Sequence, residues 1–106
     1  MQDDYDVVQR ACRLGDLSLL DEALQAAPHL LNESDAQMGW TPLYRAVICR
    51  HATLVQYLLQ KGANPNLPTK VGEYPLHQAA ETDQVDIAEL LLQNYADPNV
   101  QQNCDV

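Results

Sequence analysis

The sequence has few of the residues on which several classes of protein depend. Its 106 residues include only six Lys and Arg against fifteen Asp and Glu, and the formal net charge is −9. Phosphate backbones and anionic membrane surfaces both attract basic proteins, so this deficit argues against nucleic-acid and membrane partners. No apolar run approaches the roughly 18 residues that a membrane-spanning helix needs.

Cysteine and glycine are also scarce, and their positions exclude further kinds of site. Cys12, Cys49 and Cys104 are odd in number and show no Cys-x-x-Cys spacing, so we expect reduced thiols in a cytoplasmic or nuclear protein. No ligand pair has zinc-like spacing, and we predict neither a metal nor another cofactor. The four glycines are scattered and form no phosphate-binding loop. The acidic N-terminus does not resemble a secretory signal.

The composition that remains is that of a globular protein. Apolar residues make up 46% of the chain and charged residues 20%. A chain of this length is the size of one domain, residues 1–106, and buries about 60–70% of the surface that its unfolded form exposes. We therefore expect a core that needs no disulfide or metal.

The sequence contains an internal repeat. When the segment 36–68 is placed on 69–101, ten of the 33 paired positions are identical, and they are spread over the whole segment. A weaker copy covers about residues 3–35, with two extra residues in the link 28–37. Residues 102–106 resemble the start of a fourth copy. Because three units are a practical minimum for such an array, we expect the chain to be a segment of a longer protein.

Each copy is predicted to form a helix, a turn and a second helix. Pro42 and Pro75 suit the first position of a helix, where the missing amide is not needed. Thr41 suits the N-cap position before one of them. Apolar residues then recur at helical spacing in both helices of each copy. Gly62 is expected to end a second helix in the left-handed conformation.

The motifs in these copies resemble those of ankyrin repeats. Residues 41–46 read Thr-Pro-Leu-Tyr-Arg-Ala and residues 74–79 read Tyr-Pro-Leu-His-Gln-Ala, similar to the family's Thr-Pro-Leu-His-x-Ala opening. Residues 58–66 and 91–99 resemble its closing stretch. The resemblance covers about residues 6–101. It implies an all-α repeat solenoid, in which stacked helix-turn-helix units are joined by hairpin loops.

Several positions depart from the ankyrin pattern. Tyr44 replaces the histidine of the second copy and Tyr74 replaces the threonine of the third, so neither copy should form the complete Thr–His hydrogen-bonded corner that the resemblance implies. Arg50, Asp83 and Tyr95 stand where the family has glycine. Because a bulky residue in the left-handed conformation costs about 1 kcal/mol, we expect a stack of moderate stability.

The sequence offers little for catalysis. Cys49 and His51 are two residues apart, so on a helix they do not share a face as nucleophile and base. His77 matches the family's structural histidine. We therefore predict no catalytic residue, and an enzyme with a Cys49 nucleophile is the weakest hypothesis.

The resemblance instead implies that another protein or peptide binds to the hairpin tips and to the concave face of the first helices. The matching positions are Asp3, Tyr5, Arg13, Leu14, Gln37, Met38, Trp40, Ile48, Cys49, Lys70, Val71, Glu73, Glu81, Thr82, Asn103 and Cys104. Trp40, the single Trp, is the expected anchor, with Met38 and Ile48 beside it. Trp40 could instead lie over the neighbouring hairpin, and Ile48 could pack against the next repeat. Tyr44 and Tyr57 are predicted to pack between repeats.

Charge is distributed unevenly along the chain. Residues 1–40 carry −6, residues 41–72 carry +4 and residues 73–106 carry −7. Opposite charges on neighbouring units can fix their stacking order. Alternatively, the basic centre can select a partner with an acidic segment.

The predicted function is that of a non-enzymatic, monomeric adaptor or scaffold. The alternative is a direct inhibitor of an enzyme such as a kinase. The resemblance also implies hydroxylation of Asn66 and Asn99, because Leu58 and Leu91 stand eight residues before them.

Overall fold

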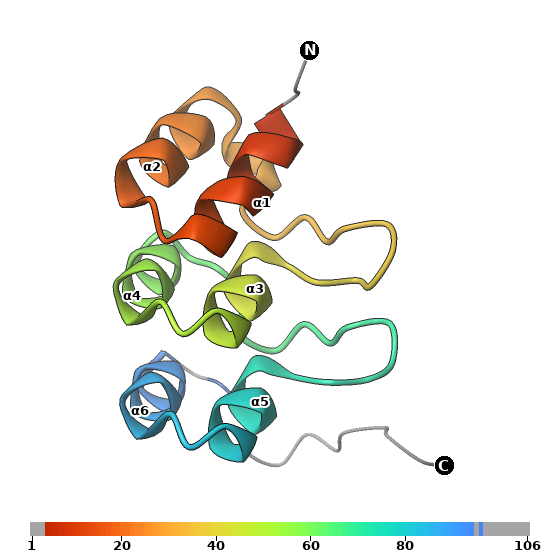
Figure 1. Cartoon of the computed structure of the whole chain (residues 1–106), viewed down its shortest axis with the longest axis vertical. Helices are drawn as coiled ribbons and strands as arrows, with labels where there is room; N and C mark the ends of the chain where they lie inside the picture. The colour runs from red at the N-terminus through yellow and green to blue at the C-terminus, as the bar shows by residue number, and fades with distance from the viewer. Residues whose placement is uncertain (1–3, 95, 97–106) are drawn as a thin grey trace.

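The computed structural model describes residues 4–94 and 96, which form three stacked pairs of helices (Figure 1). The elements are α1 (Asp4–Leu14), α2 (Leu17–Ala26), the 3-10 helix η1 (Pro28–Leu30), α3 (Pro42–Ile48), α4 (Ala52–Gln60), α5 (Pro75–Glu81) and α6 (Val85–Gln93). No strand occurs within these described residues. The predicted all-α repeat solenoid is confirmed.

The helices form two columns. The first helices of the pairs, α1, α3 and α5, lie in one column, and α2, α4 and α6 lie in the other (Figure 1). The loops 31–41 and 61–74 project from the first column in the same direction. We call the surface made by α1, α3, α5 and these two loops the loop-side surface. It holds the hairpin tips and the first helices, where the resemblance places partner binding.

The helix starts follow from local residue chemistry. Pro42 begins α3 and Pro75 begins α5, as predicted. Thr41 Oγ1 accepts a hydrogen bond of 3.1 Å from the Tyr44 amide, so the second unit keeps the threonine half of the corner. Tyr74 stands at the same position of the third unit and packs its ring edge-on against His77, with centroids 6.0 Å apart.

Two turns between paired helices are strained. Arg50 has φ of 65° and Asp83 has φ of 61°, so both adopt the left-handed conformation that was predicted for them. Gly62 has φ of 96° and ends α4 in the expected way. Tyr95 lies outside the described residues. The two bulky residues therefore carry the conformational cost that the missing glycines would have avoided.

Polar bonds tie each unit to its neighbours around a continuous apolar core. The Tyr44 hydroxyl donates to Glu73 Oε1 at 3.1 Å, and the Tyr57 hydroxyl donates to Asp21 Oδ1 at 2.7 Å. Each bond joins two units, so the prediction that these tyrosines lie between repeats is confirmed. The hydroxyl of buried Tyr44 also lies 3.3 Å from Gln78 Oε1.

Candidate functional site

The tips of the two loops are bonded to each other. The Lys70 amide donates to the Met38 carbonyl at 3.1 Å, and the Lys70 ammonium donates to the Ala36 carbonyl. Gly39 allows this approach, because a Cβ at that position would lie 2.7 Å from the Lys70 nitrogen. The two tips carry exposed apolar side chains, since Met38 is 49% exposed and Val71, which follows Lys70, is 61% exposed.

Asp35 organises the first loop. Its Oδ1 accepts hydrogen bonds from the amides of Met38 and Gly39, at 2.6 and 2.9 Å, and its Oδ2 forms an ion pair of 3.2 Å with Arg45. Burial alone would raise the pKa of this carboxyl, but these hydrogen bonds and that from the Trp40 amide hold it below its ordinary value. An ionised Asp35 therefore fixes the shape of the loop.

Trp40 lies at the base of the same loop and is half-buried. Its ring packs against Tyr44, with centroids 5.4 Å apart, and the Arg45 guanidinium stands 4.9 Å from the ring centroid. The Trp40 carbonyl accepts a bond of 3.0 Å from the Asp35 amide. These contacts hold the ring within its own unit and leave part of it exposed.

A polar pocket of about 260 Å³ lies between α1 and α3. We call it the arginine pocket, and it is lined by Asp6, Gln9, Arg10, Arg13 and Arg45. The Arg45 Nε donates to Gln9 Oε1, which joins the two helices. Three arginine side chains thus line one pocket on the loop-side surface of an acidic chain. They can form bidentate hydrogen bonds with a carboxylate or a phosphate.

Arg13 was predicted from the sequence as a site residue, whereas Gln9, Arg10, Asp35 and Arg45 were not. One available signal was the variable position of the Thr-Pro-Leu-His-x-Ala motif, which Arg45 occupies. A second was the spacing of Arg10 and Arg13, which are three residues apart and therefore neighbours on a helix. No comparable pattern marks Asp35.

The structure divides the predicted site residues into two groups. The loop group, on the loops and at the start of α1, contains Tyr5, Gln37, Met38, Trp40, Lys70, Val71 and Glu73. The helix-end group, at the C-terminal ends of α1, α3 and α5, contains Arg13, Leu14, Ile48, Cys49, Glu81 and Thr82. Because α3 has seven residues, the groups lie about 10 Å apart along its axis. Asp3, Asn103 and Cys104 lie outside the described residues.

Exposure differs within these groups. Arg13, Leu14, Gln37, Met38, Lys70, Val71 and Glu81 are exposed, and the other predicted residues are half-buried. Three of the half-buried residues form side-chain hydrogen bonds within the fold. Glu73 accepts from Tyr44, the Thr82 hydroxyl donates to the Gln78 carbonyl, and the Tyr5 oxygen accepts from Gln9.

The cysteines are free thiols where the structure describes them. Cys12 is buried, and this burial raises the pKa of its thiol to about 12, which is unsuited to a nucleophile. Cys49 is half-buried at the end of α3. Asn66 is half-buried, and Asn99 lies outside the described residues.

Neither a metal-binding cluster nor a membrane-spanning helix is found in the part of the chain that the structure describes. No three His, Cys, Asp or Glu side chains gather there in a way that could hold an ion. None of the helices has the length and apolar character needed to cross a bilayer.

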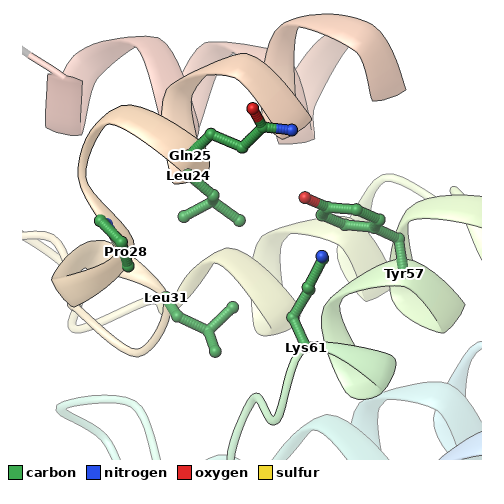
Figure 2. Close-up of a pocket in the computed structure, with 6 residues that line it drawn as sticks. All are labelled: Leu24, Gln25, Pro28, Leu31, Tyr57 and Lys61. Atoms are coloured by element: carbon green, nitrogen blue, oxygen red, sulfur yellow. The ribbon is translucent and has the colours of Figure 1, made fainter.

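A second pocket lies between α2, η1 and α4 and has a volume of about 280 Å³ (Figure 2). It is lined by Leu24, Gln25, Pro28, Leu31, Tyr57 and Lys61. The Lys61 ammonium stands 5.5 Å from the centroid of the Tyr57 ring. Pro28 and Leu31 come from the lengthened link after the first unit, and the sequence did not predict this pocket.

Comparison with known proteins agrees with this architecture. Residues 8–102 match the family model described as "Ankyrin repeats (3 copies)". Over 68 residues the chain is 37% identical to YahD of Escherichia coli (strain K12), which is named as an ankyrin repeat protein; the match covers 59% of this chain and 33% of YahD.

Similar matches come from animal proteins named "Ankyrin repeat, SAM and basic leucine zipper domain-containing protein 1". Identity is 41% over 59 residues for Ornithorhynchus anatinus, covering 56% of this chain and 12% of the relative. Identity is also 41% over 56 residues for the Homo sapiens protein, and this match covers 53% of this chain and 11% of the relative. The matches thus span a third or less of each relative's length. The chain belongs to the ankyrin repeat family, whose repeats are generally non-enzymatic protein–protein interaction modules.

Proposed function

We propose that the chain is a monomeric, non-enzymatic adaptor or scaffold module that binds a partner protein on its loop-side surface. The observation that carries the proposal is the bond between the loop tips, which joins the backbone of exposed Met38 to Lys70, the residue before exposed Val71. Trp40 is half-exposed at the base of the first of these loops. Apolar and aromatic side chains gathered in this way are typical of interface hot spots.

The arginine pocket defines a second feature of the partner. Arg10, Arg13 and Arg45 line it, and Asp6 is the one acid among the described residues that do so. The bound segment therefore combines an apolar side chain for the loop tips with an acidic group for the pocket. Charge of this kind contributes more to selectivity and association rate than to affinity. We place the interaction in the cytoplasm or nucleus, where the thiols of Cys12 and Cys49 stay reduced.

The proposal is tested with a variant that changes both loop tips, Met38→Ser with Val71→Ser. Its matched control is Leu17→Ser, because Leu17 is 37% exposed on α2, away from the loops. Proteins captured from a cell extract by each purified bait are quantified by mass spectrometry. We expect a set that is retained by the wild-type chain and the control and lost by the double variant.

Equal capture by all three baits would contradict the proposal. Circular dichroism must show that the double variant still unfolds cooperatively, since otherwise its loss of binding reflects unfolding. Trp40→Ala is a less selective variant, because it also removes the packing of the ring on Tyr44 and Arg45. If a captured partner is an enzyme such as a kinase, its turnover with the purified chain distinguishes an inhibitor from a scaffold.

A further inference from the structure

Half of the basic residues of this acidic chain line one pocket. The chain contains six Lys and Arg, and three of them, Arg10, Arg13 and Arg45, line the arginine pocket between α1 and α3. Arg10 and Arg13 belong to the first unit and Arg45 to the second, so the stacking of the units brings them to one place. Like charges that share a pocket repel one another, and a bound anion offsets that repulsion.

Two of the three arginines are not paired within the fold. In the part of the chain that the structure describes, the side chains of Arg10 and Arg13 form neither a hydrogen bond nor an ion pair. Arg10 is half-buried and Arg13 is exposed. Because a cation that is partly removed from water is stabilised by an opposite charge, these side chains favour an anionic ligand.

Arg45 is held in place by its own contacts. Its Nη2 forms the ion pair of 3.2 Å with Asp35, and its Nε donates to Gln9 Oε1. Its guanidinium also stands 4.9 Å from the centroid of the Trp40 ring. The two hydrogen bonds leave other N–H donors of the guanidinium for a ligand, because the group has five. The pocket therefore has a fixed cation on α3 opposite two unpaired ones on α1.

The number of donors favours a phosphate over a carboxylate. A carboxylate has two acceptor oxygens, and the fork of one guanidinium can satisfy both. A phosphate monoester carries a charge of about −1.5 to −2 at pH 7 and has three acceptor oxygens. Of the acids beside these arginines, Asp35 is already bonded to Arg45 and Asp6 is exposed. A phosphate can therefore bond to arginines of both helices at once.

We propose that the arginine pocket binds the phosphate of a phosphorylated serine or threonine in the partner segment. Arg10 and Arg13 of α1 and Arg45 of α3 donate hydrogen bonds to the phosphate oxygens. This inference rests on the proposed function, because it specifies the acidic group of the segment that the loop-side surface binds. It adds a means of regulation, since phosphorylation of the partner strengthens the interaction and dephosphorylation weakens it.

The test uses a short fluorescein-labelled synthetic peptide that carries one phosphoserine between leucines. Two twin peptides carry Ser or Glu in place of the phosphoserine. Binding to the 106-residue chain is followed by fluorescence anisotropy at physiological ionic strength. We expect the phosphoserine peptide to bind at least about tenfold more tightly than the Ser twin and at least about threefold more tightly than the Glu twin.

Three variants locate the binding. Arg10→Gln and Arg13→Gln should each weaken binding of the phosphoserine peptide by about fivefold or more, because each removes a charged donor. Arg13 is exposed, so its replacement leaves the core intact and gives a valid result even if Arg10→Gln unfolds the chain. The matched control is Lys61→Gln, which removes one positive charge at the end of α4 and should leave the affinity within about twofold.

Four results would overturn the proposal. They are absence of binding by the phosphoserine peptide, equal binding of the Ser twin, equal binding of the Glu twin, and equal weakening by Lys61→Gln.

A second experiment separates this inference from the proposed function. The cell extract is treated with a phosphatase before proteins are captured from it, and we expect the wild-type chain to lose the set that depends on Met38 and Val71. Unchanged capture would overturn the inference and leave the proposed function standing. Conversely, the Met38→Ser, Val71→Ser variant should still prefer the phosphoserine peptide over its Ser twin, because all three arginines are present. The proposed function can therefore fail while this preference remains.

Discussion

The amide of Lys70 donates a hydrogen bond of 3.1 Å to the carbonyl of Met38, and this bond joins the tips of two loops that belong to successive copies of the repeat. The bond requires a close approach of backbone to backbone. Gly39 makes that approach possible, so the arrangement of the loop tips depends on a residue that has no side chain.

The first prediction compares two glycines with positive φ. Gly39→Ala should destabilise the chain by more than Gly62→Ala, because a Cβ at position 39 would lie 2.7 Å from the Lys70 nitrogen and 2.8 Å from Lys70 Cγ. A Cβ at position 62 would meet nothing within 4 Å, so it carries only the backbone cost of about 1 kcal/mol. Urea unfolding measures both, and equal losses would show that the loop contact contributes nothing.

The second prediction compares two tyrosines that join units. Tyr44→Phe should lower the free energy of unfolding by about 1–2 kcal/mol, because it leaves Glu73 and Gln78 without their shared donor at a site that is 1% exposed. Tyr57→Phe should cost less, because Tyr57 is only half-buried and water can replace its hydroxyl beside Asp21. The Tyr57 hydrogen bond is the main cause that lowers the pKa of Asp21, so that pKa should rise in Tyr57→Phe.

Chemical denaturation measures the two stabilities, and nuclear magnetic resonance titration follows the Asp21 carboxyl. A larger loss for Tyr57→Phe than for Tyr44→Phe would contradict the interpretation. An unchanged pKa of Asp21 would show that the hydroxyl donates elsewhere in solution.

The fold was predictable because its determinants are local and repeated. Pro42 and Pro75 begin helices, and Arg50 and Asp83 adopt the left-handed conformation of the glycines that they replace. Each of these features depends on the residue and its immediate neighbours, and the constant length of the repeat places the second and third units in register with each other. Tertiary packing therefore overrides few of the conformational preferences of these local segments.

The site was predicted less completely, because its contacts cross between elements. Asp35 pairs with Arg45 over ten residues, and Gln9 meets Arg45 over 36 residues. No periodic pattern specifies such pairs, since they depend on how far α1 lies from α3 and on the side-chain rotamers. Trp40 was predicted to be a partner-binding residue, and its packing on Tyr44 and Arg45 was not predicted.

The third prediction concerns alkaline pH. Burial raises the pKa of the Cys12 thiol from 9.0 to about 12. Because the folded state favours the protonated thiol, its stability is fully present below about pH 9 and is lost as pH rises toward 12. We expect the free energy of unfolding to fall between pH 8 and pH 10.5 by about 1–2 kcal/mol from this group.

Urea unfolding at several pH values checks this expectation. Cys12→Ala should flatten the decline, and Cys49→Ala, which removes a half-buried thiol, is the matched control. The Tyr57 pKa is raised from 10.0 to about 12, so Tyr57 adds to the decline above pH 10 in every variant. A decline of equal slope in Cys12→Ala would assign the pH dependence to other groups.

The last prediction uses the two strained turns. Asp83→Gly should raise the free energy of unfolding by about 0.5–1 kcal/mol, because glycine adopts φ of 61° without the cost that a Cβ imposes. Part of this gain is lost because glycine makes the unfolded chain more flexible. Arg50→Gly should gain less, since Arg50 Nη2 donates to the Thr82 carbonyl at 3.2 Å and glycine removes that bond between units.

The control variant Asp86→Gly makes the same exchange inside α6 and should destabilise by about 0.5–1 kcal/mol, as glycine does in helices. Thermal unfolding of the three variants therefore tests strain directly. If glycine stabilises at position 83 and destabilises at position 86, the difference comes either from the backbone conformation or from the carboxylates. Asp83→Asn and Asp86→Asn separate these causes, since each removes the charge and keeps the Cβ.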